Sequence, residues 1–462
     1  MDKRISALFK GDKVIWMVFF FLCLISVIEV FSASSELTFK GGSYLAPMLK
    51  HIGILIVGIF FTLVTLNIKC KYFKIATPIL LAVSFFALIW VLIAGHSTNG
   101  AQRWVSLLGI QFQPSELAKG TLVLATAQVL SAMQTNYGAD RHAMRYILTV
   151  CAFIVPLIAV ENLSTAALLC VVIFLMMMIG RVPTRQLLEL VGGVAAAVAL
   201  VIGTVMLFGE DHNDAMTRQA QAAAIAQGGQ VAVTPERKGV FHRFDTWKSR
   251  IDNFANKRDL PPDSVDLDKD AQTAYANIAI ASSNIIGKGP GNSVTRDFLP
   301  QAFSDYIYAI IIEEMGIEGA VFVALLYIIL LFRTGRIANR CANNFPAFLA
   351  MGLALLLVIQ ALFNMCVAVG IAPVTGQPLP LISKGGTSSI INCIYIGAIL
   401  SVSRTSKKTR PWQPTTATRQ RSASGRGRKP PRHSRRKVRR LCVNNKKIAY
   451  FCRKHKRLWI NL

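Results

Sequence analysis

The chain has 462 residues, of which 53% are hydrophobic and only 16% are charged, and its mean hydropathy is +0.45. This composition excludes an ordinary soluble protein, because the apolar residues fall in runs of roughly 17–25 residues, the length that spans a bilayer. The net charge of +27 is concentrated in residues 404–462, which hold 21 Lys and Arg and no acid, so only +6 belongs to the rest of the chain.

Ten apolar runs are predicted to be transmembrane helices, so the expected fold class is an all-α polytopic membrane protein of about ten spans. The first run follows the N-terminal residues without a small-residue cleavage site, and we expect it to be retained rather than removed as a signal peptide. Together the runs form a membrane domain at 14–403, in which a long polar loop, residues 210–304, separates the seventh span from the eighth. The spans cover residues 14–34, 46–67, 75–95, 115–133, 146–160, 165–180, 187–208, 305–332, 346–370 and 386–403.

The positions of Lys and Arg predict the orientation. They are dense before the first span and after the second, fourth, sixth, eighth and tenth, whereas the short loops between hold only Lys40, Arg103 and Lys384. The positive-inside rule therefore places the N-terminus (1–13) and the basic tail (404–462) in the cytoplasm. The tail has the composition of disorder, and we expect it to contact anionic lipids rather than nucleic acid.

This orientation puts the polar motifs on the outer face, so any chemistry is expected to be extracytoplasmic. Two polar residues near the outer ends of the first two spans receive simpler interpretations. Glu29 is expected to reach the membrane interface rather than to be buried beside a cation, and His51 is expected to be an interfacial side chain rather than a ligand. The motif-bearing loops are 96–114, 161–164, 210–304 and 372–385.

The loop after the third span offers cations for a phosphate group. Arg103 stands beside Trp104, a cation next to an interfacial aromatic. A helix is predicted to start at Pro114, and it places Glu116 and Lys119 three residues apart on one face. That pair is either a self-satisfied ion pair or part of a substrate site, and the spacing alone does not separate the two.

The long outer loop ends in NIAIASSNIIGKGPGNS, which predicts a surface helix followed by a Gly-rich loop. Backbone N–H groups of such a loop can bind phosphate, although glycine runs are more often plain turns, and no nucleotide-binding context surrounds this one. The shorter outer loop ENLST, at 161–165, is predicted to be only a tight turn.

The stretch Phe298–Gly316, FLPQAFSDYIYAIIIEEMG, combines three acids with an apolar run. Asp305 precedes the run and is either the cap of its helix or a functional acid. Glu313 and Glu314 lie inside the run, where a carboxylate is costly and marks a functional-site hypothesis by default. We expect these two to be structural acids paired with cations from neighbouring helices.

The loop after the ninth span, GIAPVTGQPLPLISKGGTSS, is dense in Pro and Gly at membrane depth. Non-helical backbone there is tolerated only when it is buried in protein or lines a cavity. Ser383, Lys384, Gly385 and Gly386 would place a hydroxyl, a cation and free backbone donors at the mouth of that cavity, and they are predicted to bind substrate.

Four of these segments together resemble the SEDS family (shape, elongation, division and sporulation), the membrane glycosyltransferases that polymerise lipid II into peptidoglycan. The GNS and PVTGQPLP variants resemble the division branch (FtsW-type) more than the elongation branch (RodA-type). The segments, which occur in the family's order, are GAQRWVSLLGIQFQPSELAK at 100–119, GKGPGNS at 287–293, FLPQAFSDYIYAIIIEEMG at 298–316 and NMCVAVGIAPVTGQPLPLISKGGTS at 364–388.

The resemblance implies site residues as well as a fold. The catalytic aspartate of the family falls on Asp305, and its outer Arg and its Glu/Lys pair fall on Arg103, Glu116 and Lys119. Two departures stand out: ENLST replaces the family's usual Pro-Asp-x-Gly-Thr turn, and Lys384 stands where many members have Tyr.

Glycosyl transfer from a lipid pyrophosphate needs a base, cations for the leaving group and a groove for the polyprenyl chain. Asp305 is the predicted base, and Arg103, Lys119 and Lys384 are predicted to stabilise the departing pyrophosphate. An α-linked donor that yields a β-1,4 glycan implies inversion in a single displacement. A divalent cation, Mg²⁺ or Mn²⁺, could share this work, but the nine cysteines show no metal-ligand spacing and no motif requires a metal.

The expected partners are lipid II, a class B penicillin-binding protein transpeptidase and other division proteins, in the cytoplasmic (inner) membrane at the division septum, with no role for nucleic acid. Two alternatives stay open: a lipid II flippase or transporter, which would share the spans and the broken backbone, and a non-catalytic division scaffold that recruits a transpeptidase. Clustering of the polar motifs on one face counts against a transporter, and a scaffold should survive mutation of Asp305.

Overall fold

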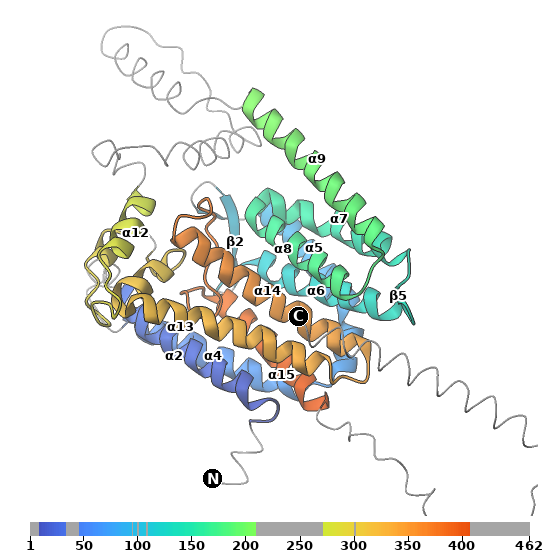
Figure 1. The fold of residues 1–462 in the computed structure, drawn as a ribbon, viewed down its shortest axis with the longest axis horizontal. Coiled ribbons are helices and arrows are strands. Elements are labelled where there is room, and N and C mark those ends of the chain that lie inside the picture. Colours follow the sequence, from blue (N-terminus) through green and yellow to red (C-terminus); the bar gives the residue numbers. More distant parts are fainter. Residues whose placement is uncertain are drawn as a thin grey trace, which may run out of the picture. The chain divides into compact units, whose positions relative to one another are not determined.

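The structure is a computed structural model, and each of the ten predicted spans coincides with one of its helices (Figure 1). It describes residues 9–33, 46–94, 96–98, 101–107, 110–208, 271–299 and 302–406. The ten helices are α2 (Lys13–Ala33), α4 (Ala46–Asn67), α5 (Cys70–Ala94), α6 (Pro114–Ala132), α7 (Ala143–Glu161), α8 (Leu163–Ile179), α9 (Thr184–Phe208), α13 (Ile307–Ala338), α14 (Asn344–Ala368) and α15 (Thr387–Ser406).

The chain is mostly helical and polytopic, as predicted. Among the described residues, six helices are long and apolar enough to cross a membrane: α2, α4, α5, α7, α13 and α14. Helix α8 is a shorter apolar helix. The figure of ten spans stays a prediction, and the predictions for residues 1–8, 209–270 and the tail beyond Ser406 lie outside the described part of the chain.

Helix α14 is central to the bundle, because it packs against α6, α8, α13 and α15. Nearly all of its buried side chains are apolar, as expected for a helix surrounded by other helices in a membrane. The exceptions are two amides, Gln360 and Asn364, which lie one turn apart and are both buried. They mark the face of α14 that holds the candidate site.

Helices α4 and α15 approach closely because small residues face each other. A Cβ atom at Gly58 would lie 2.7 Å from Cys393 Sγ, and one at Gly397 would lie 2.8 Å from Thr62 O. Thr62 Oγ1 donates a hydrogen bond to Cys393 O (2.9 Å). Small residues of this kind let transmembrane helices pack at short range, where no hydrophobic driving force acts between them.

Short strands interrupt the helical fold in two loops. The loop after α5 forms an antiparallel sheet of β1 (His96–Thr98), β2 (Ala101–Leu107) and β3 (Ile110–Phe112), in which Val105 pairs with Phe112. Between α6 and α7, β4 (Gln134–Thr135) pairs with β5 (Gly138–Ala139). The sequence does not predict these strands, because runs of two to seven residues between helices leave little periodic pattern to detect.

The end of the long polar segment has the predicted form. Helix α12 (Ala271–Ala281) leads into the loop that contains Gly287, Gly289 and Gly291, which all have positive φ angles, and a 3₁₀ helix, η3 (Thr295–Asp297), follows. Figure 1 shows α12 beside the start of α13, at the opposite end of the bundle from β5. This end of the bundle also holds the candidate site.

An ion pair ties the start of α2 to α13. Arg333 Nε and Nη2 donate to Asp12 Oδ1 and Oδ2 at 3.0 and 2.8 Å, and Val14 N donates to Asp12 Oδ1 at 2.9 Å. Burial alone would raise the pKa of Asp12, but the hydrogen bonds from Arg333 and Val14 outweigh it and hold that pKa below its ordinary value. Two-pronged pairs between Arg and a carboxylate are among the stronger ion pairs.

We expect Asp12→Asn to lower the melting temperature of the purified protein, at a cost of about 1–3 kcal/mol, because Arg333 loses a charged partner. Since the folded state depresses the pKa of Asp12, the contribution is present above the ordinary aspartate pKa and is lost as the pH falls through the folded-state value. Thermal unfolding in detergent from neutral to acidic pH measures both effects. Asp140→Asn, in an exposed pair with His142, is the control, and equal melting temperatures for wild type and Asp12→Asn at neutral pH would contradict the prediction.

Candidate active site

Asp305 lies in the turn of residues 302–306 that leads into α13. It is half-buried, and Ser304 Oγ donates to its Oδ1 at 3.0 Å. The N-cap of α13 is Tyr306, which makes no side-chain capping bond. Asp305 therefore does not occupy the N-cap position, and the geometry favours the functional interpretation of this acid over the capping one.

The loop between α14 and α15 holds the turn of Asp305 in place. Asn364 Nδ2 donates to Asp305 O (2.8 Å) and to Gln377 O (2.7 Å). Ser383 Oγ donates to Ser304 O at 2.6 Å. Of the two settings that this Pro- and Gly-rich backbone tolerates, the structure shows burial in protein at Gln377 and Ser383, and the cavity whose mouth was expected at Ser383–Gly386 stays a prediction.

The four predicted substrate-binding residues of this loop have different surroundings. Ser383 is buried, and its hydroxyl is already engaged, because it also accepts from Leu379 N (2.8 Å). Lys384 N donates to Phe303 O (3.0 Å), and its ammonium lies 5.0 Å from the centre of the Phe303 ring. Gly385 O accepts from Ser388 Oγ (2.8 Å), and Gly386 has a φ of +55°.

Lys384 is a half-buried cation that contacts this turn of α13 through Phe303. Burial, and secondly the charge of Lys50 on α4, lower the pKa of Lys384. Its position over Phe303, two residues before Asp305, puts a positive charge beside the candidate base. This placement is compatible with a contact between Lys384 and substrate phosphate. That contact stays a prediction.

Glu116 and Lys119 form the predicted pair, but they lie deep in the bundle. Lys119 Nζ is 2.8 Å from Glu116 Oε1 and donates to Gln360 Oε1 at 2.8 Å. The Lys119 side chain is 1% exposed and the Glu116 side chain is 3% exposed. Gln360 Nε2 in turn donates to Pro378 O (3.0 Å). The geometry favours an ion pair within the fold, which supports the loop between α14 and α15, and Glu116 Oε2 is left buried without a hydrogen-bond partner among the described residues.

We expect Lys119→Met to destabilise the protein by about 3–5 kcal/mol, because Glu116 is left buried and without its cation. Glu116→Gln/Lys119→Met should recover much of that loss, since the uncompensated charge is gone. Thermal unfolding of wild type and both variants measures the difference. A pair that served only to bind substrate would leave both melting temperatures unchanged.

Arg103 lies in β2, in the sheet after α5, and its side chain is outside the part that the structure describes. The prediction that Arg103 binds phosphate therefore stays a prediction.

The turn at residues 161–165 is better defined. Asn162 is the N-cap of α8, where its Oδ1 accepts from Ser164 N (3.1 Å) and Thr165 N (3.4 Å), and Gln377 Nε2 donates to Thr165 Oγ1 at 2.6 Å. The turn is thus attached to the loop between α14 and α15. Its sequence did not indicate this attachment.

The Gly-rich loop after α12 presents its backbone donors to protein carboxylates. Gly291 N donates to Glu314 Oε2 (3.0 Å), and Val294 N donates to Glu313 Oε1 (3.2 Å). Ser293 donates to both acids, from N to Glu314 (3.3 Å) and from Oγ to Glu313 (2.5 Å). These N–H groups are therefore already used, and the possibility that they bind phosphate is not supported.

Glu313 and Glu314 have cationic partners, as predicted, but the partners come from the loop after α12 and from η3 rather than from neighbouring transmembrane helices. Lys288 Nζ lies 2.7 Å from Glu313 Oε1, and Arg296 Nη1 lies 4.0 Å from Glu314 Oε1. Ser32 of α2 also donates to Glu314. The expectation of helix-borne partners was wrong because the outer loop folds back onto α13, a contact that no local sequence pattern reveals.

A break in α13 makes this contact possible. Gly316 has φ +69° and ψ −172° inside the helix, and the freed carbonyls of the preceding turn accept from the loop: Lys288 N donates to Glu313 O (3.0 Å) and Gly289 N donates to Glu314 O (2.8 Å). A Cβ atom at Gly316 would lie 2.1 Å from Ile285 O. Glycine is required here both by the backbone conformation and by the close approach.

We expect Gly316→Ala to release residues 285–293 from α13. The strain of an alanine at this φ, on the order of 1–3 kcal/mol, corresponds to roughly five- to hundredfold faster opening of the contact. Hydrogen–deuterium exchange at the amides of Lys288 and Gly289 measures it. Gly335→Ala, a helical position with nothing within 4 Å of the added Cβ, is the control; unchanged exchange in both variants would show that the loop does not depend on the break.

Two simpler predictions were wrong. Glu29 is fully buried in α2 rather than at the interface, and its carboxylate oxygens have no hydrogen-bond partner in the described part of the chain. His51 is 1% exposed, and its Nε2 lies 2.8 Å from Ser26 Oγ, which donates to Ile382 O (2.7 Å). Both residues lie near ends of their spans but are buried inside the protein.

Among the residues that the structure describes, no three His, Cys, Asp or Glu side chains lie together in a way that could hold a metal ion. The expectation that a divalent cation could assist the reaction therefore gains no support from the geometry, and it stays a prediction.

The chain is similar to known proteins over most of its length. A family model described as "Cell cycle protein" (FtsW, RodA and SpoVE) matches residues 12–408. A "Probable peptidoglycan glycosyltransferase FtsW" of Halomonas elongata is 29% identical over 400 residues, which cover 84% of this chain and 89% of that protein. A protein of the same name from Hahella chejuensis is 30% identical over 391 residues, 82% of this chain and 87% of that one.

Solved structures share the fold. One chain, described as "Structural coordination of polymerization and crosslinking by a peptidoglycan synthase complex", has a TM-score of 0.61 at 22% identity and covers 86% of this chain and 99% of its own length. The rod shape determining protein RodA of Thermus thermophilus has a TM-score of 0.55 at 21% identity, with 85% and 97% covered. At this identity the likeness shows the fold alone.

Proposed function

The chain belongs to the SEDS family, and we propose that it is a peptidoglycan glycosyltransferase of the FtsW type. In this proposal it polymerises lipid II into β-1,4 glycan strands at the outer face of the cytoplasmic membrane during cell division and releases undecaprenyl pyrophosphate. The names of the relatives from Halomonas and Hahella support the activity.

The observation that carries the proposal is the position of Asp305. This half-buried acid lies outside the helix of α13, in a turn fixed by Ser304, Ser383 and Asn364. A general base must be held at a defined place and must still reach the proton that it removes. Glu116, Glu313 and Glu314, by contrast, are buried and bound to protein partners, so they cannot readily take that role.

In the proposed mechanism Asp305 takes the proton from the acceptor sugar hydroxyl as that oxygen attacks the anomeric carbon of the donor. The bond to the pyrophosphate breaks in the same displacement, which inverts the anomeric configuration. Lys384 and Arg103 stabilise the negative charge that develops on the leaving group. Glu116 and Lys119 do not contact substrate in this mechanism. Lys119 instead supports the loop that carries Lys384, through Gln360 and Pro378.

We further propose a class B penicillin-binding protein as the partner, at the division septum and with both termini of this chain in the cytoplasm. Support comes from the fold shared with a chain of a complex that coordinates polymerization with crosslinking. The flippase alternative would need a polar site near the midplane with access to both sides. Its strongest candidates, Glu313 and Glu314, are instead bound to the loop after α12.

We expect Asp305→Asn to reduce glycan polymerisation by about 100-fold or more, because an amide cannot act as the base. The measurement is glycan-chain formation from purified lipid II in detergent, with and without the cognate transpeptidase, whose own active site is inactivated. Glu318→Gln, an exposed acid of the same helix, is the matched control. Normal polymerisation by Asp305→Asn would show that the base is wrongly assigned, and binding of lipid II without polymer from wild type would favour a flippase or a scaffold.

A further inference from the structure

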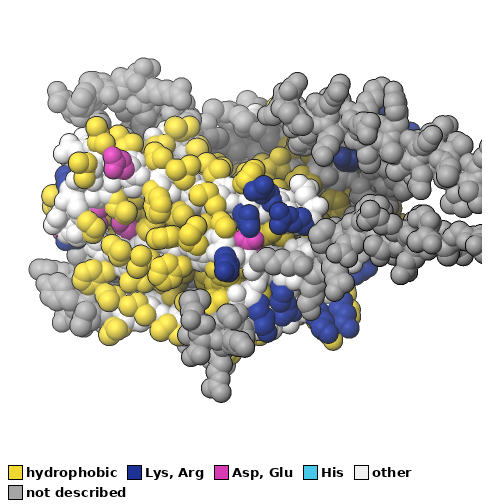
Figure 2. Space-filling view, turned by 60° about the horizontal axis from the view of Figure 1, so that its bottom comes forward, with side chains coloured by type: hydrophobic (Ala, Val, Ile, Leu, Met, Phe, Trp, Pro, Cys, Tyr) yellow, Lys and Arg dark blue, Asp and Glu magenta, His cyan; other side chains and the backbone are white. Residues whose placement is uncertain are grey.

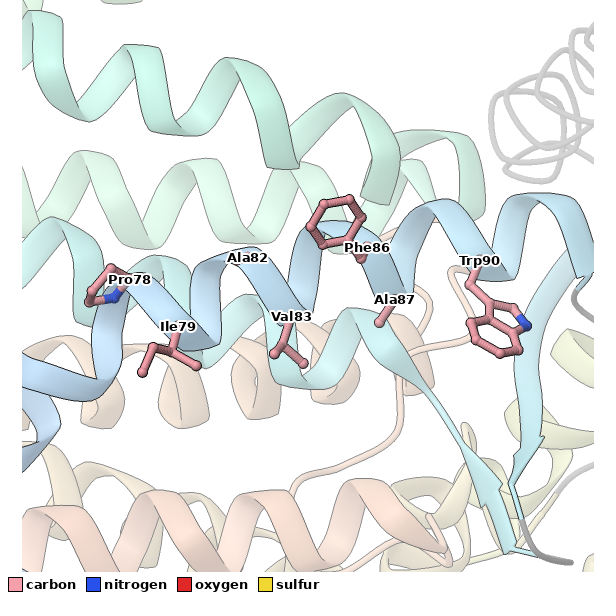
Figure 3. A pocket seen from close by; sticks show the side chains of 7 residues that line it. All are labelled: Pro78, Ile79, Ala82, Val83, Phe86, Ala87 and Trp90. Carbon is pink, nitrogen blue, oxygen red and sulfur yellow. The ribbon is translucent and has the colours of Figure 1, made fainter.

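Two apolar hollows lie beside α5. One, of about 530 Å³, lies between α5, α6 and α7. The other, of about 630 Å³, is a shallow, open hollow on the surface of α5, lined among the described residues only by side chains of this helix from Pro78 to Trp90 (Figure 3). Pro78 lines both hollows, so they meet at this residue and together flank α5 on two sides.

Basic side chains border the hollows at one end. Lys74 precedes Thr77 and Pro78 by three and four residues, so it shares their face of α5, and Lys71 lies one turn further. Both lysines are exposed, and neither forms an ion pair with any other residue in the described part of the chain. Figure 2 shows that Lys and Arg side chains gather at one end of the apolar surface.

Long basic side chains at the end of a membrane helix extend their apolar stems along the helix and place the cation at the interface. Because helical side chains lean toward the N-terminus, Lys71 and Lys74 extend away from the hollows, toward the start of α5. The site therefore has an apolar body inside the membrane and a positive end at its edge. The positive-inside rule assigns this edge to the cytoplasmic leaflet.

The hollow between α5, α6 and α7 also contains an unused hydrogen-bond acceptor. Gln128 Oε1 is buried and has no partner among the described residues, whereas Thr77 Oγ1 donates to Phe73 O (2.9 Å). Gln128 is one turn from Ala132, near the end of α6. A buried acceptor without a partner favours an occupant or a water molecule that supplies a donor.

We propose that this region binds an anionic glycerophospholipid of the cytoplasmic leaflet. Its phosphate lies at Lys71 and Lys74, and its two acyl chains occupy the two hollows on either side of Pro78. Charge complementarity decides between a lipid and an apolar helix of another protein, because only the lipid brings an anion to the interface together with an apolar body.

The test uses the full-length protein in nanodiscs of phosphatidylcholine that contain a small fraction of phosphatidylglycerol with a photoactivatable acyl chain. Crosslinked peptides are mapped by mass spectrometry. We expect the label to concentrate on α5, α6 and α7. Lys71→Gln/Lys74→Gln should reduce this label roughly 10- to 30-fold, the effect of two basic residues near an anionic surface.

Two further variants serve as controls. Lys10→Gln/Lys13→Gln neutralises two exposed lysines at the start of α2, predicted to lie at the same membrane face, and should leave the label unchanged. Ala132→Phe fills the hollow between α5, α6 and α7 without a change of charge and should remove the label from α6 and α7. All variants keep the basic tail, so its attraction for anionic lipid cancels.

Three outcomes would overturn the proposal. The first is label spread evenly over the helices, the second is equal labelling by photoactivatable phosphatidylcholine, and the third is an equal loss of label in the α2 control. Label on α6 and α7 that survives Ala132→Phe would also refute the placement of an acyl chain between those helices. None of these measurements depends on polymerase activity, so the result is independent of the proposed function.

Discussion

The buried backbone between α14 and α15 is the constraint on which the site depends. Water cannot supply hydrogen bonds to non-helical backbone at membrane depth, so protein side chains must do so. These side chains come from α2, α13 and α14, so the loop needs the assembled bundle to hold its shape. The bonds that satisfy its carbonyls are Asn364 to Gln377, Gln360 to Pro378, Tyr327 to Pro380 and Ser26 to Ile382.

The same constraint separates five of the ionisable residues into two groups. Glu116, Glu313 and Glu314 are buried, and their charges are balanced by cations and backbone N–H groups that belong to the fold. A buried charge without such partners would be strongly destabilising. Asp305 and Lys384 are only half-buried and lie in the turns that meet at the start of α13. Asp305 and Lys384 are therefore better placed than the buried acids to act on a substrate.

Helix α6 connects the two ends of the bundle. Its first turns carry Glu116 and Lys119, which support the loop between α14 and α15 through Gln360. Its last turns, from Ala125 to Ala132, line the hollow proposed to hold a lipid chain. Helix α6 packs against α5 and α14, and it carries both the pair that supports the candidate site and side chains that line the proposed lipid hollow.

The sequence by itself determined the ten helices and the family, and it singled out Asp305 as the candidate base, because apolar length and unbroken motifs are local properties that survive without a structure. It also indicated the Glu116–Lys119 pair from helical spacing. Only the tertiary structure decided that this pair is buried, that Glu313 and Glu314 hold the Gly-rich loop, and that Glu29 and His51 lie inside the protein. Burial and hydrogen-bond partners depend on segments distant in the chain, such as Ser32 beside Glu314, and no local pattern records which distant segment will cover a residue.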